Sequence, residues 1–188
     1  VKSLPGRKIL NVFFMIPMFF GGGTIPTYLV IRAIGISNFN ENEIEKLLAN
    51  CEIVPSLLQV ECHPYFPQTE LKKLLAQHDI ALQAWYPLGG RGNSDILDEP
   101  VVRDLAVKYG KTPAQVIMRW HIQEGNIVIP GSKNPTHIAD NIDVFDFELT
   151  DSDMAAMATL DREKRFYERT PEKLAHYATW RPDVENQK

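Results

Sequence analysis

The chain has 188 residues, of which 44% are hydrophobic and 23% are charged, and its formal net charge is −4 at pH 7. This composition is that of an ordinary soluble globular protein with room for one sizeable core or two small ones. The acidic balance excludes a basic nucleic-acid-binding surface, so we expect no nucleic-acid partner. Two cysteines, Cys51 and Cys62, make neither a disulfide framework nor a metal cluster. We expect them to be buried, reduced thiols in a cytoplasmic protein, and we predict no metal site.

Residues 1–31 differ from the rest of the chain. Ile9 to Ile31 contain no charge and include a dense block of Phe, Met and Ile. A membrane-spanning helix needs about 20 predominantly apolar residues, and it tolerates proline and glycine. Basic residues precede the block, so a signal peptide is an alternative, and the first residue, Val1, suggests a fragment. The pattern leaves membrane contact of residues 9–31 open.

Regular strand and helix patterns begin after Ile31. Short apolar runs predict strands, and apolar residues at helical spacing predict the helices between them. Asn40 with Glu43 forms a capping-box pattern, and Thr112-Pro113 is typical of a helix start. The predicted strands are 32–37, 57–61, 80–85 and 126–129, and the predicted helices are 41–50, 69–78, 99–109, 112–123, 135–143 and 150–160.

Four strand–helix units in succession indicate an α/β fold with a parallel sheet. No G-x-G-x-x-G pattern follows a predicted strand, which counts against an open dinucleotide-binding sheet. A complete (β/α)8 barrel takes about 250 residues and eight units. We therefore predict half of a TIM barrel, with about four β/α units plus extra helices. The predicted division is an apolar segment 1–31, a half-barrel 32–161 and a C-terminal tail 162–188.

Polar and aromatic residues gather where the predicted strands end, which is where parallel barrels carry their chemistry. The segment from Ala81 to Gly92 is a strand that runs into Trp-Tyr-Pro and a glycine-rich loop, which suits a flat, phosphorylated cofactor. Ser132 and Lys133 precede a helix, whose N-terminal amides and dipole favour a phosphate.

Each of these residues also has a simpler explanation. Ser37 and Asn38 fit a turn that leads into a helix, and Trp85 fits a core aromatic. His63 fits a hydrogen-bonded loop histidine rather than a metal ligand or an acid–base group. Asp140 and Asn141 fit a solvated helix face. The common placement at strand ends is the stronger signal.

Five strings at these positions resemble the C-terminal half of an aldo-keto reductase. They occur in the family's order and with family-like spacing, from about Arg32 to the C-terminus. The strings are Arg32-Ala-Ile-Gly-Ile-Ser-Asn-Phe-Asn40, Gln59-Val-Glu-Cys-His-Pro-Tyr65, Ala84-Trp-Tyr-Pro-Leu-Gly89, Val128-Ile-Pro-Gly-Ser132, and Asp140-Asn141 followed by Phe145-Asp-Phe-Glu-Leu-Thr150.

The resemblance implies the C-terminal half of a (β/α)8 barrel that binds extended NADPH, with NADH possible, and reduces small aldehydes and ketones. It implies that Trp85 stacks on the nicotinamide ring. By the same resemblance, Ser37, Asn38 and Gln59 would bind the nicotinamide carboxamide, Tyr86, Leu88 and Gly89 would line the pyrophosphate path, Ser132, Lys133 and His137 would approach the adenosine phosphate, and Asp140 and Asn141 would hold the adenine.

Two departures from the family pattern affect these expectations. Many members have Lys where this chain has Gly131 and Arg where it has His137, and arginine is the permanent bidentate partner for phosphate. The preference for NADPH over NADH is therefore open. The family's catalytic Asp, Tyr, Lys and His belong to the first half of the barrel, and no counterpart motifs precede Arg32. We assign no catalytic residue and expect the chain to be inactive alone.

The first 31 residues carry a different resemblance. Leu4-Pro-Gly-Arg-Lys8 and Met18-Phe-Phe-Gly-Gly-Gly-Thr-Ile-Pro-Thr-Tyr-Leu-Val-Ile31 resemble a membrane stretch of a sugar-type ABC-transporter permease. The hypothesis that follows is a chimera with its junction near Arg32 to Gly35. Two alternatives stay open: a membrane-associated, permease-derived fragment, and a non-catalytic binding module that self-associates through open sheet edges.

Overall fold

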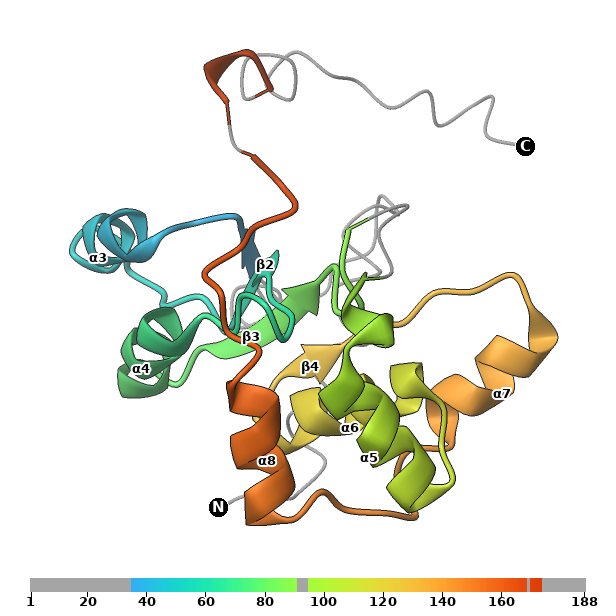
Figure 1. The fold of residues 1–188 in the computed structure, drawn as a ribbon. Helices are drawn as coiled ribbons and strands as arrows, with labels where there is room; N and C mark the ends of the chain where they lie inside the picture. The colour runs from blue at the N-terminus through green and yellow to red at the C-terminus, as the bar shows by residue number, and fades with distance from the viewer. Residues whose placement is uncertain (1–34, 91–94, 169, 174–188) are drawn as a thin grey trace, which may run out of the picture.

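A computed structural model describes residues 35–90, 95–168 and 170–173 of the chain. The apolar segment 1–31, with its predicted membrane contact and its permease resemblance, lies outside these residues. The described strands form one sheet in the order β1-β2-β3-β4, and each pairs parallel with the next (Figure 1). The predicted parallel α/β fold with four β/α units is therefore confirmed. The strands are β1 (Gly35–Ser37), β2 (Leu57–Glu61), β3 (Ala81–Trp85) and β4 (Ile127–Val128).

The helices follow the predicted order, and most end one to two residues inside the predicted bounds. A 3-10 turn that the sequence did not predict, η2 (Asp95–Asp98), comes before the helix that was expected to begin at Glu99. Figure 1 shows two helices beside β1 to β3 and the others grouped near β4. The α-helices are α3 (Glu41–Leu48), α4 (Thr69–Gln77), α5 (Pro100–Tyr109), α6 (Pro113–Gln123), α7 (Pro135–Ile142) and α8 (Asp151–Ala158).

Local side chains fix the helix ends. The Asn40 Oδ1 accepts the Glu43 N–H at 2.9 Å, and the Glu43 carboxylate accepts the Asn40 N–H at 2.9 Å, so the predicted capping box at α3 is confirmed. Gly110 ends α5 with a φ of 64°, a conformation that costs a side-chain-bearing residue energy. These boundaries follow from neighbouring residues, which is why the sequence could predict them.

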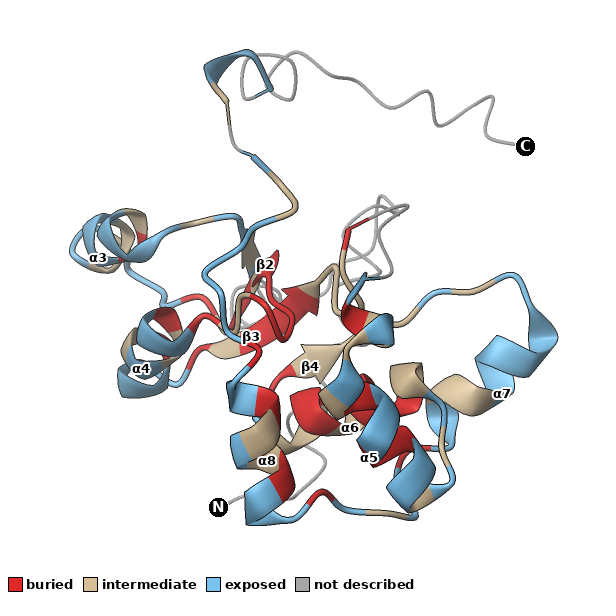
Figure 2. Ribbon diagram, in the orientation of Figure 1, coloured by how far each residue is buried: buried red, intermediate tan, exposed pale blue. Residues whose placement is uncertain are grey.

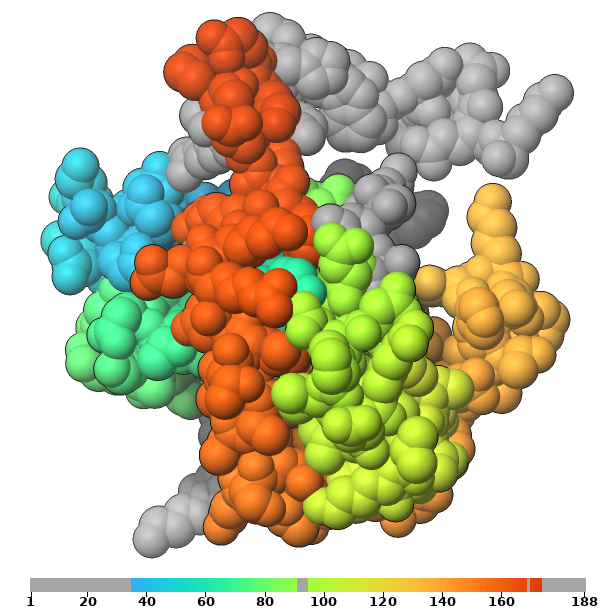
Figure 3. Space-filling view, viewed as in Figure 1, coloured from blue at the N-terminus to red at the C-terminus, as the bar shows by residue number. Residues whose placement is uncertain are grey.

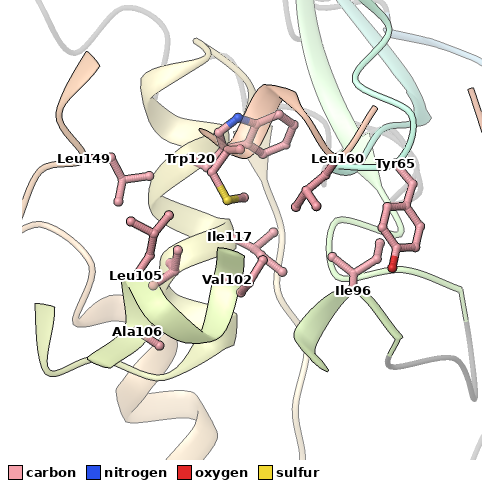
Figure 4. Close-up of a cluster of buried hydrophobic side chains, with 11 residues drawn as sticks. Tyr65, Ile96, Val102, Leu105, Ala106, Ile117, Trp120, Leu149 and Leu160 are labelled. Atoms are coloured by element: carbon pink, nitrogen blue, oxygen red, sulfur yellow. The ribbon is translucent and has the colours of Figure 1, made fainter. Parts of the chain in front are cut away.

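The sheet and its helices form two buried clusters. In the first, Leu58 and Leu82 pack against α3 and α4, and Figure 2 shows this burial along β2 and β3. In the second, residues of α5, α6 and α8 pack around Ile117 and Trp120; Figure 4 shows these two side chains with Val102 and Leu105 of α5. Successive strand residues point to opposite faces. Since Leu58 faces the helices, Gln59 and its counterparts on β3 lie on the other face of the sheet.

The structure also bears on the cysteines, on membrane-spanning helices and on metal ligands. Cys62 is buried and Cys51 is only half-buried, so the prediction of two buried thiols is wrong for Cys51, which lies in the turn after α3 rather than on a packed element; neither forms a disulfide. Within the described ranges, no helix combines the length and the apolar character that crossing a membrane requires. The same residues contain no group of three His, Cys, Asp or Glu side chains arranged to hold a metal ion.

Candidate cofactor site

A row of polar side chains crosses the sheet near the carboxyl ends of the strands. Ser37 is in register with Gln59, and Gln59 is in register with Gln83. The Gln59 Nε2 donates to the Gln83 Oε1 at 2.6 Å, and the Asn38 N–H donates to the Gln59 carbonyl at 2.9 Å. Partners in register on a parallel sheet point to the same side. The row therefore offers hydroxyl and amide groups that can hydrogen-bond a planar carboxamide.

Trp85 lies at the end of β3, two residues beyond Gln83, and is in register with Glu61. Its indole is half-buried and belongs to neither core cluster, unlike Trp120, which is 3% exposed. The ring of Tyr86 stacks on the indole at 3.9 Å between centroids, and the ring of Tyr167 meets it edge-on at 5.2 Å and 76°. The structure thus places Trp85 beside the polar row rather than in a core.

The loop from Tyr86 to Gly89 makes a tight turn. Tyr86 has a φ of 55° and Gly89 a φ of 96°, and the Gly89 N–H donates to the Tyr86 carbonyl at 2.9 Å. A positive φ at a tyrosine is strained and is typical of functional positions. Leu88 packs against the second cluster, which fixes the far side of the turn. The family resemblance implies that Tyr86 lines the pyrophosphate path; in the structure its ring lies on Trp85.

His121, a buried histidine that the sequence analysis did not assign to the site, hydrogen-bonds to the backbone of this loop. The His121 Nε2 donates to the Pro87 carbonyl at 3.1 Å, while its Nδ1 accepts from the Asn126 Nδ2 at 3.1 Å. Burial lowers the pKa of His121 to about 3, so the ring is neutral at pH 7. A neutral ring has one donor and one acceptor nitrogen, and these two partners use both. His121 and Asn126 therefore hold the loop backbone in place.

The phosphate-side residues predicted from the sequence lie on one loop and one helix. The Ser132 Oγ accepts the Asn134 N–H at 3.0 Å, and Asn134 caps α7 by accepting the Thr136 N–H at 3.0 Å. No residue of α7 is buried; Lys133 and His137 are exposed, whereas Asp140 and Asn141 are half-buried. Figure 1 shows α7 set apart from the end of β3, so a ligand that reaches both groups has to be extended.

Glu61 is a buried carboxylate that the sequence did not assign to the site. Its side chain is 2% exposed, and one of its oxygens lies 3.1 Å from the His63 Nε2. Burial raises the pKa of Glu61, but hydrogen bonds from His63 and from the Phe166 and Tyr167 amides outweigh this and hold the pKa below its ordinary value. His63 is fully buried and its ring hydrogen-bonds to Glu61, which agrees with the interpretation of His63 as a hydrogen-bonded histidine. Strand residues two positions apart point to the same face of a sheet. The spacing of Gln59 and Glu61 was therefore the sequence signal that Glu61 lies on the same face as the candidate site.

The sequence profile described as the aldo/keto reductase family matches residues 30–162. An aldo-keto reductase of Mycolicibacterium smegmatis is 50% identical over 135 residues, which are 72% of this chain and 48% of that protein. The methylglyoxal reductase DkgA of Escherichia coli K12 is 41% identical over 136 residues, 72% of this chain and 49% of that protein. The chain thus spans about half the length of the curated relatives it matches.

Solved structures agree with this assignment. A mutant of Gox0644 in complex with NADPH is 40% identical, with a TM-score of 0.68 over 74% of this chain and 50% of that chain. An aldo-keto reductase from a deep-sea metagenome library is 31% identical, with a TM-score of 0.70 over 79% of this chain and 59% of that one. The four parallel strands match part of these (β/α)8 barrels. The chain belongs to the aldo/keto reductase family of oxidoreductases.

Proposed function

We propose that the half-barrel of residues 32–161 binds NADPH, with NADH as the alternative, and presents its nicotinamide ring to a small aldehyde or ketone. The observation that carries this proposal is the row of Ser37, Gln59 and Gln83 beside the indole of Trp85. In this proposal the whole site comprises Ser37, Asn38, Gln59, Trp85, Tyr86, Leu88, Gly89, Ser132, Lys133, His137, Asp140 and Asn141.

The residues present fit a nicotinamide. A carboxamide has both a donor and an acceptor, and the hydroxyl and amide groups of the row can answer both. The indole supplies the flat surface that an aromatic ring stacks on. Because Tyr86 already covers one face of Trp85, the nicotinamide would use the opposite face or replace the Tyr86 ring. When bound, the cofactor supplies the hydride, and the protein orients it.

The phosphate end supports NADPH more weakly. Lys133 is an exposed cation next to the N-terminus of α7, and the NADPH complex of the relative favours the phosphorylated cofactor. Gly131 has open space around its Cα, where many family members have a lysine. The positive charge at this end of the site therefore comes from Lys133.

We propose that this chain alone binds cofactor without turning over substrate. A carbonyl oxygen needs a proton donor whose pKa lies near the working pH, and such a donor contributes roughly 10²–10⁴-fold in rate. Tyr65 does not suit that role, because burial and its hydrogen bond to Glu99 raise its pKa to about 12. The resemblance assigns no tyrosine of this chain to the role.

Cofactor titration tests the binding proposal. NADPH and NADH are added to the full chain while tryptophan fluorescence is followed, and calorimetry gives an independent affinity. We expect quenching by NADPH, and about tenfold weaker binding for Trp85→Ala, since an aromatic pair contributes up to about 1.5 kcal/mol. Trp85→Phe, which keeps a flat ring, is the matched control and should bind nearly as well as the unmodified chain. If neither cofactor binds, the proposal is wrong, and aldehyde-dependent oxidation of NADPH would overturn the expected inactivity.

The remaining interpretations concern the segment 1–31 and the sheet edges. We propose a foreign origin for 1–31; the family match covers residues 30–162 and so leaves 1–29 of this segment outside it. Long sequencing reads across the junction test it, and upstream tetrad motifs in the parent gene would exclude it. Partition of the chain into detergent tests membrane contact of residues 9–31. Size-exclusion chromatography tests self-association through β1 and β4, the outer strands of the described sheet.

A further inference from the structure

The segment 161–167, which follows α8, is bound to the carboxyl end of β2 and to the loop after it; Figure 3 shows the chain after α8 running over the front of the molecule in this view. Two anchors hold it. The Tyr65 carbonyl accepts the Arg162 and Lys164 N–H groups at 3.2 and 3.1 Å. The Glu61 carboxylate accepts the Phe166 N–H at 2.6 Å and the Tyr167 N–H at 3.2 Å. The segment is thus tied at its start to a loop and at its end to a buried charge on β2.

At the second anchor, the Glu61 carboxylate and segment 161–167 each depend on the other. A buried carboxylate is costly unless several donors surround it. The Glu61 carboxylate finds His63 on its own strand end and takes its other donors from amides 105 and 106 residues away. If the Phe166 and Tyr167 amides moved away, the Glu61 carboxylate would lose hydrogen-bond donors. If the Glu61 side chain were neutral, its hydrogen bonds to these amides would be weaker. The two elements therefore stabilise one another.

Anchoring at Glu61 decides what lies against Trp85. With its amide bound there, Tyr167 meets the indole edge-on at 5.2 Å between ring centroids. The preceding Phe166 packs so closely on Gly90 that a Cβ at Gly90 would lie 2.8 Å from the Phe166 Cβ. Beneath the segment is a cavity of about 110 Å³, lined in part by Asn38, Glu61 and Tyr167. The segment thus contacts the glycine-rich loop, the indole and the neighbourhood of Asn38 together.

We propose that Glu61 is a positioning residue for the cofactor site: its carboxylate holds segment 161–167 across the sheet so that Tyr167 fixes the orientation of Trp85. The inference rests on the proposed function only in taking Trp85 as the surface for the nicotinamide ring. A ring that is already fixed loses less conformational freedom when a ligand stacks on it, so a released segment weakens cofactor binding. Glu61 itself need not touch the cofactor.

The test variant is Glu61→Gln, which keeps the shape of the side chain and removes its charge. Amide exchange at Phe166 and Tyr167 should accelerate by about tenfold, since hydrogen bonds to charged groups are among the stronger ones. The near-ultraviolet circular dichroism of the Trp85–Tyr167 pair should weaken, and NADPH should bind several-fold more weakly. Glu99→Gln is the matched control, because Glu99 contacts Arg162 at the start of the same segment at 2.8 Å, whereas Glu61 binds the Tyr167 amide at its end. It should leave all three readouts unchanged.

Tyr167→Ala keeps the inference testable if the Glu61 variant does not fold. It should weaken NADPH binding while the Phe166 amide still exchanges slowly, and Tyr167→Phe should restore binding. Unchanged exchange and dichroism in Glu61→Gln would overturn the inference, as would equal changes in Glu99→Gln. Exchange and dichroism are measured without cofactor, so they decide the role of Glu61 even if NADPH fails to bind to the unmodified chain.

Discussion

The nicotinamide side and the phosphate side of the proposed site are built differently. On the nicotinamide side, Gln59 and Gln83 lie on strands whose other face is buried, with Leu58 0% and Leu82 4% exposed. On the phosphate side, α7 has no buried residue, and Ile142 is 74% exposed. One side is held by the core of the protein, and the other by the caps of a surface helix, where Asn134 bonds within α7 and Asp143 binds Lys111 and Gln115.

Because of this difference, we expect the packed side to orient the nicotinamide ring and the exposed side to select between NADPH and NADH. Groups on packed strands keep their geometry before a ligand arrives, which a stacked and hydrogen-bonded ring requires. Groups on an exposed helix open more readily and tolerate substitution. We therefore expect the nicotinamide end to be sensitive to core changes, and the choice between NADPH and NADH to depend on a few surface charges.

The largest expected effect comes from removing core support beneath the polar row. Leu58→Ala should reduce the free energy of unfolding by about 2–5 kcal/mol, because it leaves a cavity under β2. Ile142→Ala removes a side chain of similar size from α7 and should change it by less than about 0.5 kcal/mol. Urea denaturation measures both. Equal losses would mean that α7 is held as firmly as the sheet.

A second pair compares two acids whose pKa values are both lowered. Burial raises the pKa of Asp153, but hydrogen bonds from Lys108, Tyr109 and Thr150 outweigh it, so its pKa falls below the ordinary range. Asp143, at the end of α7, has its pKa lowered chiefly by Lys111, but its side chain is 56% exposed. A carboxyl with a depressed pKa stabilises the fold above its unfolded pKa of about 3.9, and this stabilisation is lost as the pH falls further.

Asp153→Asn should therefore cost about 1–3 kcal/mol at pH 7 and flatten the loss of stability below about pH 4. The reason is that asparagine keeps the size of the side chain and loses the charge that Lys108 contacts at 2.7 Å. Asp143→Asn is the exposed counterpart and should cost less than Asp153→Asn, because solvent screens the ion pair of Asp143 with Lys111. Thermal unfolding between pH 3 and pH 7 measures both, and a steeper acid dependence in Asp153→Asn would contradict the assignment.

The smallest expected effect concerns cofactor choice. His137→Arg should tighten NADPH relative to NADH by about three- to tenfold, because a guanidinium makes charge-assisted hydrogen bonds to phosphate. Ile138→Arg, at the next exposed position of α7, adds the same charge pointing in another direction and is the control. The ratio of the two dissociation constants is the measurement. An equal shift in both variants would show a general charge effect rather than a phosphate contact.

Much of the fold could be predicted because its signals are local. The capping box at Asn40, the stop at Gly110 and the apolar strand runs depend on residues within a few positions. The strand ends then indicated where polar groups would meet, and the structure brings Ser37, Gln59 and Trp85 to one edge. Gln83 was missed although it alternates with Trp85 on the same strand.

By itself, then, the sequence determined the family, the order of the strands and helices, and the strand ends that carry the candidate site. Only the tertiary structure decided that Tyr86 stacks on Trp85, that His121 supports Pro87, and that Glu61 binds the Phe166 and Tyr167 amides. Secondary structure depends on neighbours in the chain, whereas a buried charge takes its partners from whatever segment the fold brings within hydrogen-bonding distance. For Glu61 that segment lies more than a hundred residues along the chain, and no local sequence pattern indicates the pairing.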